Sequence, residues 1–200
     1  MKPTNAVKIV ELVRRFGVIR PRDLDKYEIP RRYISRLYKK GVLERVGRGL
    51  YTVPGAESTE HHTIALVSKQ IPHAIVCLLS ALQFHNLTSQ NPYQVWIAIN
   101  STARRPRAPE LPIRIMRFSG VALTEGIEKH NLEGVKVKVY SIAKTVADCF
   151  KYRNKIGLDV AMEALRECIR ERRCASEDLW RYAKICRVAN VMRPYLEAIS

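Results

Sequence analysis

Basic side chains recur at helical spacing in the segment PRRYISRLYKKG, residues 30–41. If Ile34 and Leu37 are buried, four polar or basic residues share the opposite face at spacings of three or four positions. Arginine can bond two acceptors of a guanine at once, and lysine or serine can hold a phosphate. This face carries no acid, whereas a solvated helix face usually mixes both signs, so we predict a nucleic-acid contact. The four residues are Arg32, Ser35, Arg36 and Lys39.

A second basic feature follows at once in VLERVGRGLYTV, residues 42–53. Two short β-forming runs, 42–46 and 50–53, flank the sequence Gly47-Arg48-Gly49. Glycines beside Arg48 permit a tight turn and a close backbone approach, so we expect a hairpin with a cation at its tip. Arg31 adds a cation near the start of the preceding helix, where helix-turn-helix proteins contact base edges.

The elements that must position these side chains fill the first 55 residues. Apolar residues between Ala6 and Val13 follow the i, i+3, i+4, i+7 pattern of an amphipathic helix, with Thr4 or Asn5 as its cap. Pro21 opens a short second helix and Pro30 opens the third, because proline suits the first helical turn. The order of three helices and a hairpin is typical of a winged helix-turn-helix.

The charge of the chain agrees with an anionic partner. The formal net charge is +16, and residues 1–55 hold 14 Lys and Arg against 5 Asp and Glu. Self-repulsion of this size opposes compaction, and nucleic acid or an anionic membrane is the usual reason for it. No apolar run approaches the roughly 18–20 residues of a spanning helix, so we expect no membrane association.

The cysteines and the N-terminus indicate a cytoplasmic protein. The first residues mix acid with base and carry no cleavage site of small residues, so we expect no signal peptide. The cysteines are odd in number and form no C-x-x-C pair, and we expect reduced thiols rather than a disulfide framework or a zinc site. They are Cys77, Cys149, Cys168, Cys174 and Cys186.

The remainder of the chain predicts a second domain of mixed secondary structure. The polar segment PGAESTEHH is read as a linker, which gives a DNA-binding domain over 1–55 and a C-terminal domain over 56–200. Strands are expected in this second domain, and so are helices, two of them capped by Ser141 and Ser176. The fold class is therefore α+β: a winged helix-turn-helix followed by a mixed α/β domain with a small sheet and several helices. The expected helices cover 63–71 and 74–87, and the expected strands cover 93–99, 111–118 and 133–141.

Enzyme readings find little support in the sequence. A restriction-type nuclease needs carboxylates and a lysine on adjoining strands to hold Mg²⁺, and Glu133 with Lys136 does not match that spacing. Asp148 lies inside a helix, where a structural role is expected. Ser80 and His85 are five positions apart, which is a poor geometry for a nucleophile and its base. We therefore expect no catalysis, no cofactor and no metal site.

A loop near the middle of the chain holds another basic group. The segment NSTARRPRAPE, residues 100–110, is too rich in proline for a helix. Two interpretations stay open: a second contact to DNA, or a solvated surface loop. The arginines concerned are Arg104, Arg105 and Arg107.

Four segments together resemble the AbiEi family of antitoxins from type IV toxin–antitoxin and abortive-infection systems. They are LYKKGVLERVGRGLYTV (37–53), SALQFHNLTSQNPYQVWIAI (80–99), VYSIAKTVADCFKYRNKIGLDVAMEAL (139–165) and VMRPYLEA (191–198). The resemblance spans almost the whole chain in the same order.

The resemblance implies a DNA-binding autorepressor that is also an antitoxin. Its winged helix would bind repeats in its own promoter. Its C-terminal domain would oppose a nucleotidyltransferase toxin, without requiring a stable complex. The alternatives are a winged-helix regulator whose C-terminal domain senses a ligand or partner, and a DNA nuclease. On this basis the expected DNA contacts are Arg31, Arg32, Ser35, Arg36, Lys39 and Arg48.

Overall fold

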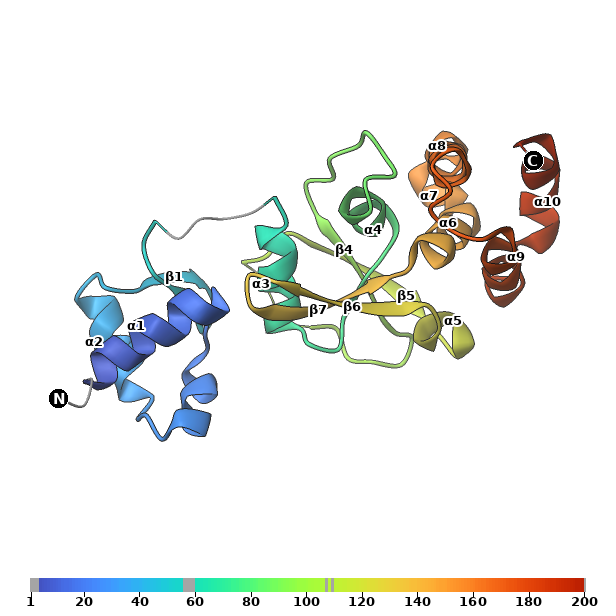
Figure 1. Ribbon diagram of the computed structural model, residues 1–200. Coiled ribbons are helices and arrows are strands. Elements are labelled where there is room, and N and C mark those ends of the chain that lie inside the picture. Colours follow the sequence, from blue (N-terminus) through green and yellow to red (C-terminus); the bar gives the residue numbers. More distant parts are fainter. Residues whose placement is uncertain (1–3, 56–59, 107, 109, 200) are drawn as a thin grey trace. The chain divides into compact units, whose positions relative to one another are not determined.

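The computed structural model describes residues 4–55, 60–106, 108 and 110–199 (Figure 1). The chain forms two compact units. The first runs from the N-terminus to Pro72 and includes Pro106–Leu111 and His130–Val137, and the second comprises the rest. The tip of one β-hairpin of the second unit's sheet therefore belongs to the first unit. The predicted domain boundary after residue 55 stays a prediction.

Three short helices build the start of the first unit. Helix α1 spans Asn5–Phe16, η1 is a 3-10 helix over Pro21–Tyr27, and α2 spans Arg32–Lys39. The Thr4 hydroxyl accepts from the backbone N–H of Val7 at 3.5 Å, as its predicted capping role requires. A fourth helix, α3 over His62–Gln70, follows the residues at 56–59 that lie outside the described part.

Apolar side chains from all three N-terminal helices meet in one core. Ile9 and Ile34 are both fully buried, as the helical spacing predicted. Each such side chain contributes about 1.5–3 kcal/mol by leaving water, so this cluster fixes which faces of α1 and α2 point outward. The core consists of Ile9, Val13, Ile19, Leu24, Ile29, Ile34, Leu37 and Leu43.

The hairpin forms with slightly different bounds from those expected. Strand β1 is Glu44–Gly47 and β2 is Leu50–Thr52, paired antiparallel with a bulge between Arg45 and Gly47. Gly47 belongs to β1, so the turn consists of Arg48 and Gly49. Gly49 has a φ of +69°, which explains why glycine occupies it, whereas Gly47 is not among the positive-φ residues.

The second unit is built on a mixed five-stranded sheet in the order β5-β4-β3-β7-β6. Its strands are β3 (Ile75–Val76), β4 (Val95–Asn100), β5 (Ile113–Phe118), β6 (Ile127–Leu132) and β7 (Val135–Tyr140). Strand β3 pairs antiparallel with β4 and parallel with β7, and β4 pairs parallel with β5.

The sheet differs from the sequence expectation at its centre and at one edge. Residues 74–87 were expected to form one helix, but Ile75 and Val76 form the central strand and the helix begins only at Leu78. Both strand residues are buried, and a short apolar run does not distinguish a buried strand from a buried helix. Strand β6, which mixes charged and apolar residues, was not expected.

Helices complete the second unit. Ser141 holds the N-cap position of α6, but its side chain makes no capping bond, and Ala175 rather than Ser176 is the N-cap of α9. The predicted cap position of Ser141 is therefore confirmed, whereas the prediction of Ser176 as a cap was wrong. The helices are α4 (Leu78–Phe84), α5 (Val121–Thr124), α6 (Ile142–Lys151), α7 (Arg153–Ile156), α8 (Leu158–Arg170), α9 (Ser176–Ile185) and α10 (Ala189–Ile199).

A fully buried ion pair lies on α6, inside the core of this unit. Lys144 Nζ contacts Asp148 Oδ2 at 2.5 Å, and neither side chain is exposed. The Cys186 thiol donates to Asp148 Oδ1 at 3.1 Å, and the Lys144 ammonium lies 4.1 Å from the centre of the Tyr140 ring. Burial raises the pKa of Asp148, while Lys144 opposes that rise. The expected structural role of Asp148 agrees with these contacts.

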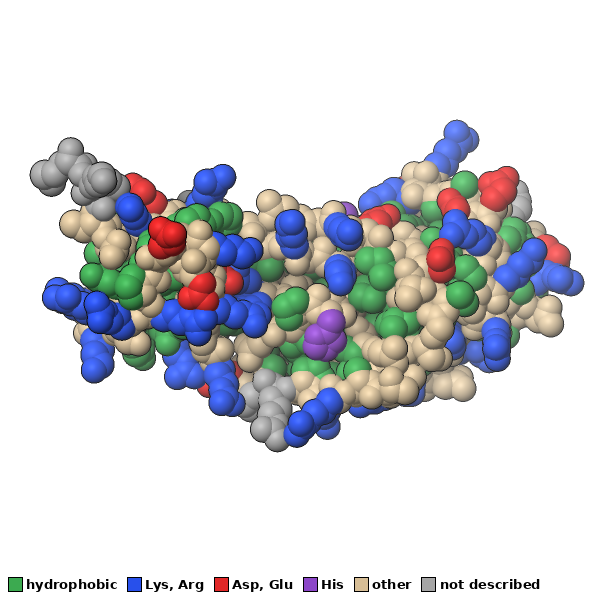
Figure 2. All heavy atoms as spheres, turned by 90° about the horizontal axis from the view of Figure 1, so that it is seen from below, with side chains coloured by type: hydrophobic (Ala, Val, Ile, Leu, Met, Phe, Trp, Pro, Cys, Tyr) green, Lys and Arg blue, Asp and Glu red, His purple; other side chains and the backbone are tan. Residues whose placement is uncertain are grey.

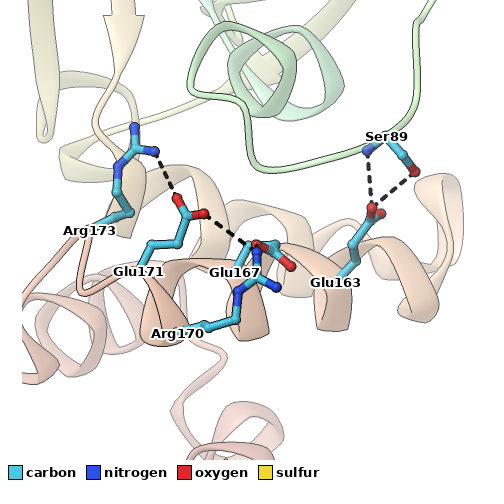
Figure 3. A network of polar contacts seen from close by, with 6 residues as sticks. All are labelled: Ser89, Glu163, Glu167, Arg170, Glu171 and Arg173. Carbon is cyan, nitrogen blue, oxygen red and sulfur yellow. Dashed lines mark hydrogen bonds and ion pairs between the residues drawn. The ribbon is translucent and has the colours of Figure 1, made fainter.

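Polar contacts hold helix α8 to the loop after α4 (Figure 3). The Glu163 carboxylate accepts from the backbone N–H and the hydroxyl of Ser89, both at 3.0 Å. Further along α8, Arg170 pairs with Glu167, and Glu171 bonds Arg173 at 3.3 Å. Glu163 and Glu167 of this helix are thus engaged by contacts within the unit.

The cysteines differ in part from the expected set of reduced thiols. Cys168 and Cys174 are joined as a disulfide with their Cα atoms 6.5 Å apart, whereas three other cysteines are free and buried. Arg172 takes a positive φ just after α8, and this turn brings the two cysteines together. The sequence, with no C-x-x-C motif, gave no sign of that turn.

Removing one partner of the buried pair should destabilise the second unit strongly. We expect Lys144→Met to lower the free energy of unfolding by about 3 kcal/mol, because it leaves Asp148 buried without its cation. Lys144→Met/Asp148→Leu should recover most of that loss. Urea unfolding measures both. The control is Arg181→Met, which breaks the exposed pair with Glu125 (2.8 Å) and should cost less than about 1 kcal/mol. Equal effects of Lys144→Met and Arg181→Met would contradict the interpretation.

Candidate nucleic-acid interface

Helix α2 presents the predicted contact face to solvent. Ile34 and Leu37 are buried at 0% and 5% exposure and anchor the helix to the core. The intervening polar side chains are therefore turned outward, and none of them has an acidic partner among the described residues. The exposed residues of this face are Arg32, Ser35, Arg36 and Lys39.

The wing is fixed to helix α2 by an aromatic contact. The rings of Tyr38 and Tyr51 meet edge to face with their centres 5.9 Å apart. Tyr51 also exchanges two backbone hydrogen bonds with Ile19, at 2.9 and 3.0 Å. Below them, the Thr52 hydroxyl donates to the Gly17 carbonyl at 2.9 Å. These contacts hold the wing in one orientation relative to α2.

Arg31 stands at the N-terminal end of α2 and forms an ion pair with Asp25. Its Nε donates to Asp25 Oδ1 at 2.8 Å, and a second nitrogen contacts Oδ2. The hydrogen bonds from Arg31 lower the pKa of the Asp25 carboxyl and raise that of the guanidinium. Both side chains are about half exposed, so the pair does little for stability. It does place a negative charge beside an expected DNA contact.

Arg48 at the wing and Arg31 at α2 line the same shallow hollow of about 360 Å³. Two further arginines, Arg20 and Arg22, line it as well, and sequence reasoning did not select them. They flank Pro21 at the start of η1, where the Arg-Pro-Arg sequence was the available signal. Within the face drawn in Figure 2, Lys and Arg side chains outnumber acidic ones over the N-terminal helices.

Two arginines of the second basic group lie in the other unit. Arg104 and Arg105 are exposed, whereas Arg107 lies outside the described residues. Arg105 lines a polar hollow of about 410 Å³ together with Arg114 and Arg117 of β5. The Arg114 guanidinium stacks 4.2 Å from the centre of the Trp96 ring, and Arg117 donates to three backbone carbonyls. These two residues were not predicted as DNA contacts, because only the arginines of the loop at 100–110 were considered and both residues lie on the strand that follows it.

The residues weighed for catalysis take structural positions. Ser80 Oγ accepts from the Trp96 backbone N–H at 2.9 Å, and His85 Nε2 contacts the Tyr140 carbonyl at 2.7 Å. His62 pairs with Glu133 at 2.7 Å. Within the described residues, no three His, Cys, Asp or Glu side chains gather closely enough to hold a metal ion. Nor does any helix in that part have the length and apolarity to cross a membrane.

Comparison with protein families gives a match over the N-terminal helices and the wing. Residues 7–54 match the family model described as "Transcriptional regulator, AbiEi antitoxin". This segment is similar to the AbiEi antitoxin family, and the match covers about a quarter of the chain. The match confirms the resemblance for the N-terminal segment alone, and it supports a DNA-binding regulator of toxin–antitoxin type. AbiEi proteins are a regulatory family, which favours a non-enzymatic role.

A solved structure extends the likeness in fold beyond the AbiEi-matched segment. The crystal structure of the RV2827C protein from Mycobacterium tuberculosis matches with a TM-score of 0.61 and 16% sequence identity. The match covers 91% of this chain and 72% of the other. At this identity the likeness concerns the fold alone. A search of curated proteins found no match.

The carboxylate beside Arg31 should weaken DNA binding by this AbiEi-type interface. We expect Asp25→Asn to raise affinity for duplex DNA about two- to fivefold near 50 mM salt, because Arg31 is then free for phosphate or base. Fluorescence anisotropy titration measures the change. Glu11→Gln, an equal change of charge at an exposed position of α1, is the control. A loss of affinity in Asp25→Asn would show instead that Asp25 orients Arg31 for its contact.

Proposed function

We propose that this protein is the antitoxin of a two-gene type IV system and represses its own promoter. The AbiEi family match and the exposed cationic face of α2 beside the wing support this proposal. The face of α2 is the observation that carries it, because it combines arginines suited to guanine with an absence of acid. Its contacts would be made by Arg31, Arg32, Ser35, Arg36, Lys39 and Arg48.

The proposed mechanism of repression is steric. Helix α2 enters the major groove of repeats in the promoter and the wing braces the backbone, so polymerase is excluded. Phosphate contacts release counterions, which makes the affinity fall steeply as salt rises. The protein acts in the cytoplasm, where its promoter is.

The C-terminal domain is proposed to oppose a nucleotidyltransferase toxin encoded beside it. A stable complex between the two proteins is not required by this proposal. The similarity of residues 7–54 to the AbiEi antitoxin family supports the antitoxin role. The gene immediately downstream is the simplest check, because a plain regulator that senses a ligand would need no such neighbour.

Loss of the α2 cations should abolish repression and leave the C-terminal role intact. We expect Arg32→Ala/Arg36→Ala to weaken binding to the upstream region about 100-fold at ~150 mM salt, because two arginine contacts are lost. A gel shift and a promoter fusion measure this. Expressed from a foreign promoter, the same variant should still rescue cells from the toxin.

Two results would overturn this division of roles. Unchanged affinity and specificity in Arg32→Ala/Arg36→Ala would exclude α2 as the recognition helix. Failure of the wild-type protein to relieve the toxicity of its neighbour would exclude the antitoxin function. Cleavage of DNA in the presence of Mg²⁺ would favour the nuclease alternative.

The basic loop of the second unit is proposed as an additional DNA contact. Arg105 shares an acid-free hollow with two arginines of β5, which favours an anionic ligand over simple solvation. We expect Arg104→Gln/Arg105→Gln to weaken binding about three- to tenfold at ~150 mM salt, equally for own-promoter and scrambled duplexes. Anisotropy measures both. An effect no larger than that of Lys8→Gln, an exposed cation of α1, would identify a solvated loop.

A further inference from the structure

We propose that Arg20, Arg22, Arg31 and Arg48 form a seat for one backbone phosphate of duplex DNA. We call this group the arginine seat. This proposal rests on the proposed DNA-binding function, and it assigns a role in DNA binding to each of the four arginines. Arg20 and Arg22 become DNA ligands, and Arg48, so far only an expected DNA contact, becomes a ligand of a backbone phosphate.

Three separate segments bring the four cations together. Arg20 and Arg22 come from the start of η1, Arg31 from the N-cap of α2, and Arg48 from the wing turn. They line one hollow of about 360 Å³ whose lining contains no acidic residue. Arg31 is paired with Asp25, but the other three like charges repel one another, so a shared anion relieves a cost that the folded protein otherwise bears. The remaining residues of the lining are Pro21, Gly49, Leu50 and Gln70.

The side chain of Arg20 gives the most specific support for an anion-binding site. Its backbone N–H is bonded to Asp23 at 2.9 Å, which fixes the residue in place. Its side-chain Nε is buried, however, and has no hydrogen-bond partner in the described part of the chain. Buried donors are rarely left unpaired, and an unpaired one costs about 1–3 kcal/mol. Arg20 also lines the hollow, so a rotation of its side chain toward a bound anion would give this donor a partner.

The other groups around the hollow can donate as well. Asp25 takes up two nitrogens of Arg31 along one edge of the guanidinium, and N–H groups on the other side stay available. Arg48 is exposed, and no ion pair or hydrogen bond of its side chain is found among the described residues. The Gln70 Oε1 is also buried without a partner there, and rotation of this amide turns its N–H donors toward an anion.

The chemistry of the hollow favours a DNA phosphate over a free nucleotide. A phosphate offers several acceptor oxygens, which suits converging guanidinium forks. A bound nucleotide would also need a surface for its base, and the hollow offers only Pro21 and Leu50 as apolar lining. Arg31 belongs to α2 and Arg48 to the wing, so a duplex that touches both elements passes its backbone over the seat.

Salt-dependent binding distinguishes the seat from base contacts. The experiment titrates duplexes of about 30 base pairs, one from the protein's own upstream region and one scrambled, by anisotropy over a series of salt concentrations. The variants are Arg20→Gln, Arg22→Gln and Arg48→Gln. Arg14→Gln is the control with the same change of charge, because Arg14 lines a different hollow with Val53 and Pro54. Thermal unfolding checks that each variant is folded.

We expect the seat variants to weaken binding to both duplexes by the same factor, about tenfold at ~150 mM salt. The salt slope should fall by about one, and the preference for the upstream region should be unchanged. Replacing single phosphates by neutral methylphosphonates should find one position that reproduces this loss in the wild type. A methylphosphonate at that position should not weaken the binding of Arg20→Gln any further. If Arg20→Gln does not fold, the exposed Arg22→Gln takes its place.

Other outcomes overturn the seat or the function separately. If the wild type prefers its upstream region but seat variants behave like Arg14→Gln, the seat is wrong and the function stands. A change of sequence preference in Arg48→Gln with an unchanged salt slope means that Arg48 reads bases, which also excludes the seat. If the wild type shows no preference but the variants still lose affinity, the seat stands and promoter recognition fails. Absence of binding to either duplex excludes both.

Discussion

Like charges must be held close together on the N-terminal helices, against their mutual repulsion. Arg20, Arg22, Arg31 and Arg48 line one hollow, and the exposed face of α2 adds more cations. The core beneath them makes this arrangement possible. Side chains such as Ile9 and Ile34 are fully buried, and their transfer from water is worth about 1.5–3 kcal/mol each. An anionic partner that binds there relieves this repulsion, so its binding free energy becomes more favourable.

The second unit handles charge in the opposite way. Lys144 and Asp148 are buried on α6 and neutralise one another within a shell of aromatic rings and the Cys186 thiol. A buried pair of this kind adds little net stability over an apolar replacement, but breaking it is expensive. It therefore ties α6 to its neighbours in a single arrangement. On the surface of the same unit, Glu163 and Glu167 of α8 are engaged by a nearby donor and a cation (Figure 3).

The two units also differ in how far the comparisons reach. The AbiEi family model covers residues 7–54, which hold the three N-terminal helices and the wing. For the second unit, the structural match at 16% identity supports the fold alone, and the antitoxin activity of this unit is a proposal. Arg114 and Arg117 of β5 give this unit a positively charged hollow. Trp96 and backbone carbonyls hold these two side chains in place.

The sequence by itself determined the elements whose signals are local. The apolar spacing around Ile9 and Ile34, the Thr4 cap and Gly49 in the wing turn each act within a few residues, and all of them were readable. Tertiary structure alone decided the rest. Ile75 and Val76 became a central strand because β4 and β7 pair with them, although the apolar run that contains them also fits the pattern of a buried helix. The convergence of Arg20 with Arg48 likewise depends on the pairing of Ile19 with Tyr51, and no spacing rule connects residues so far apart in the chain.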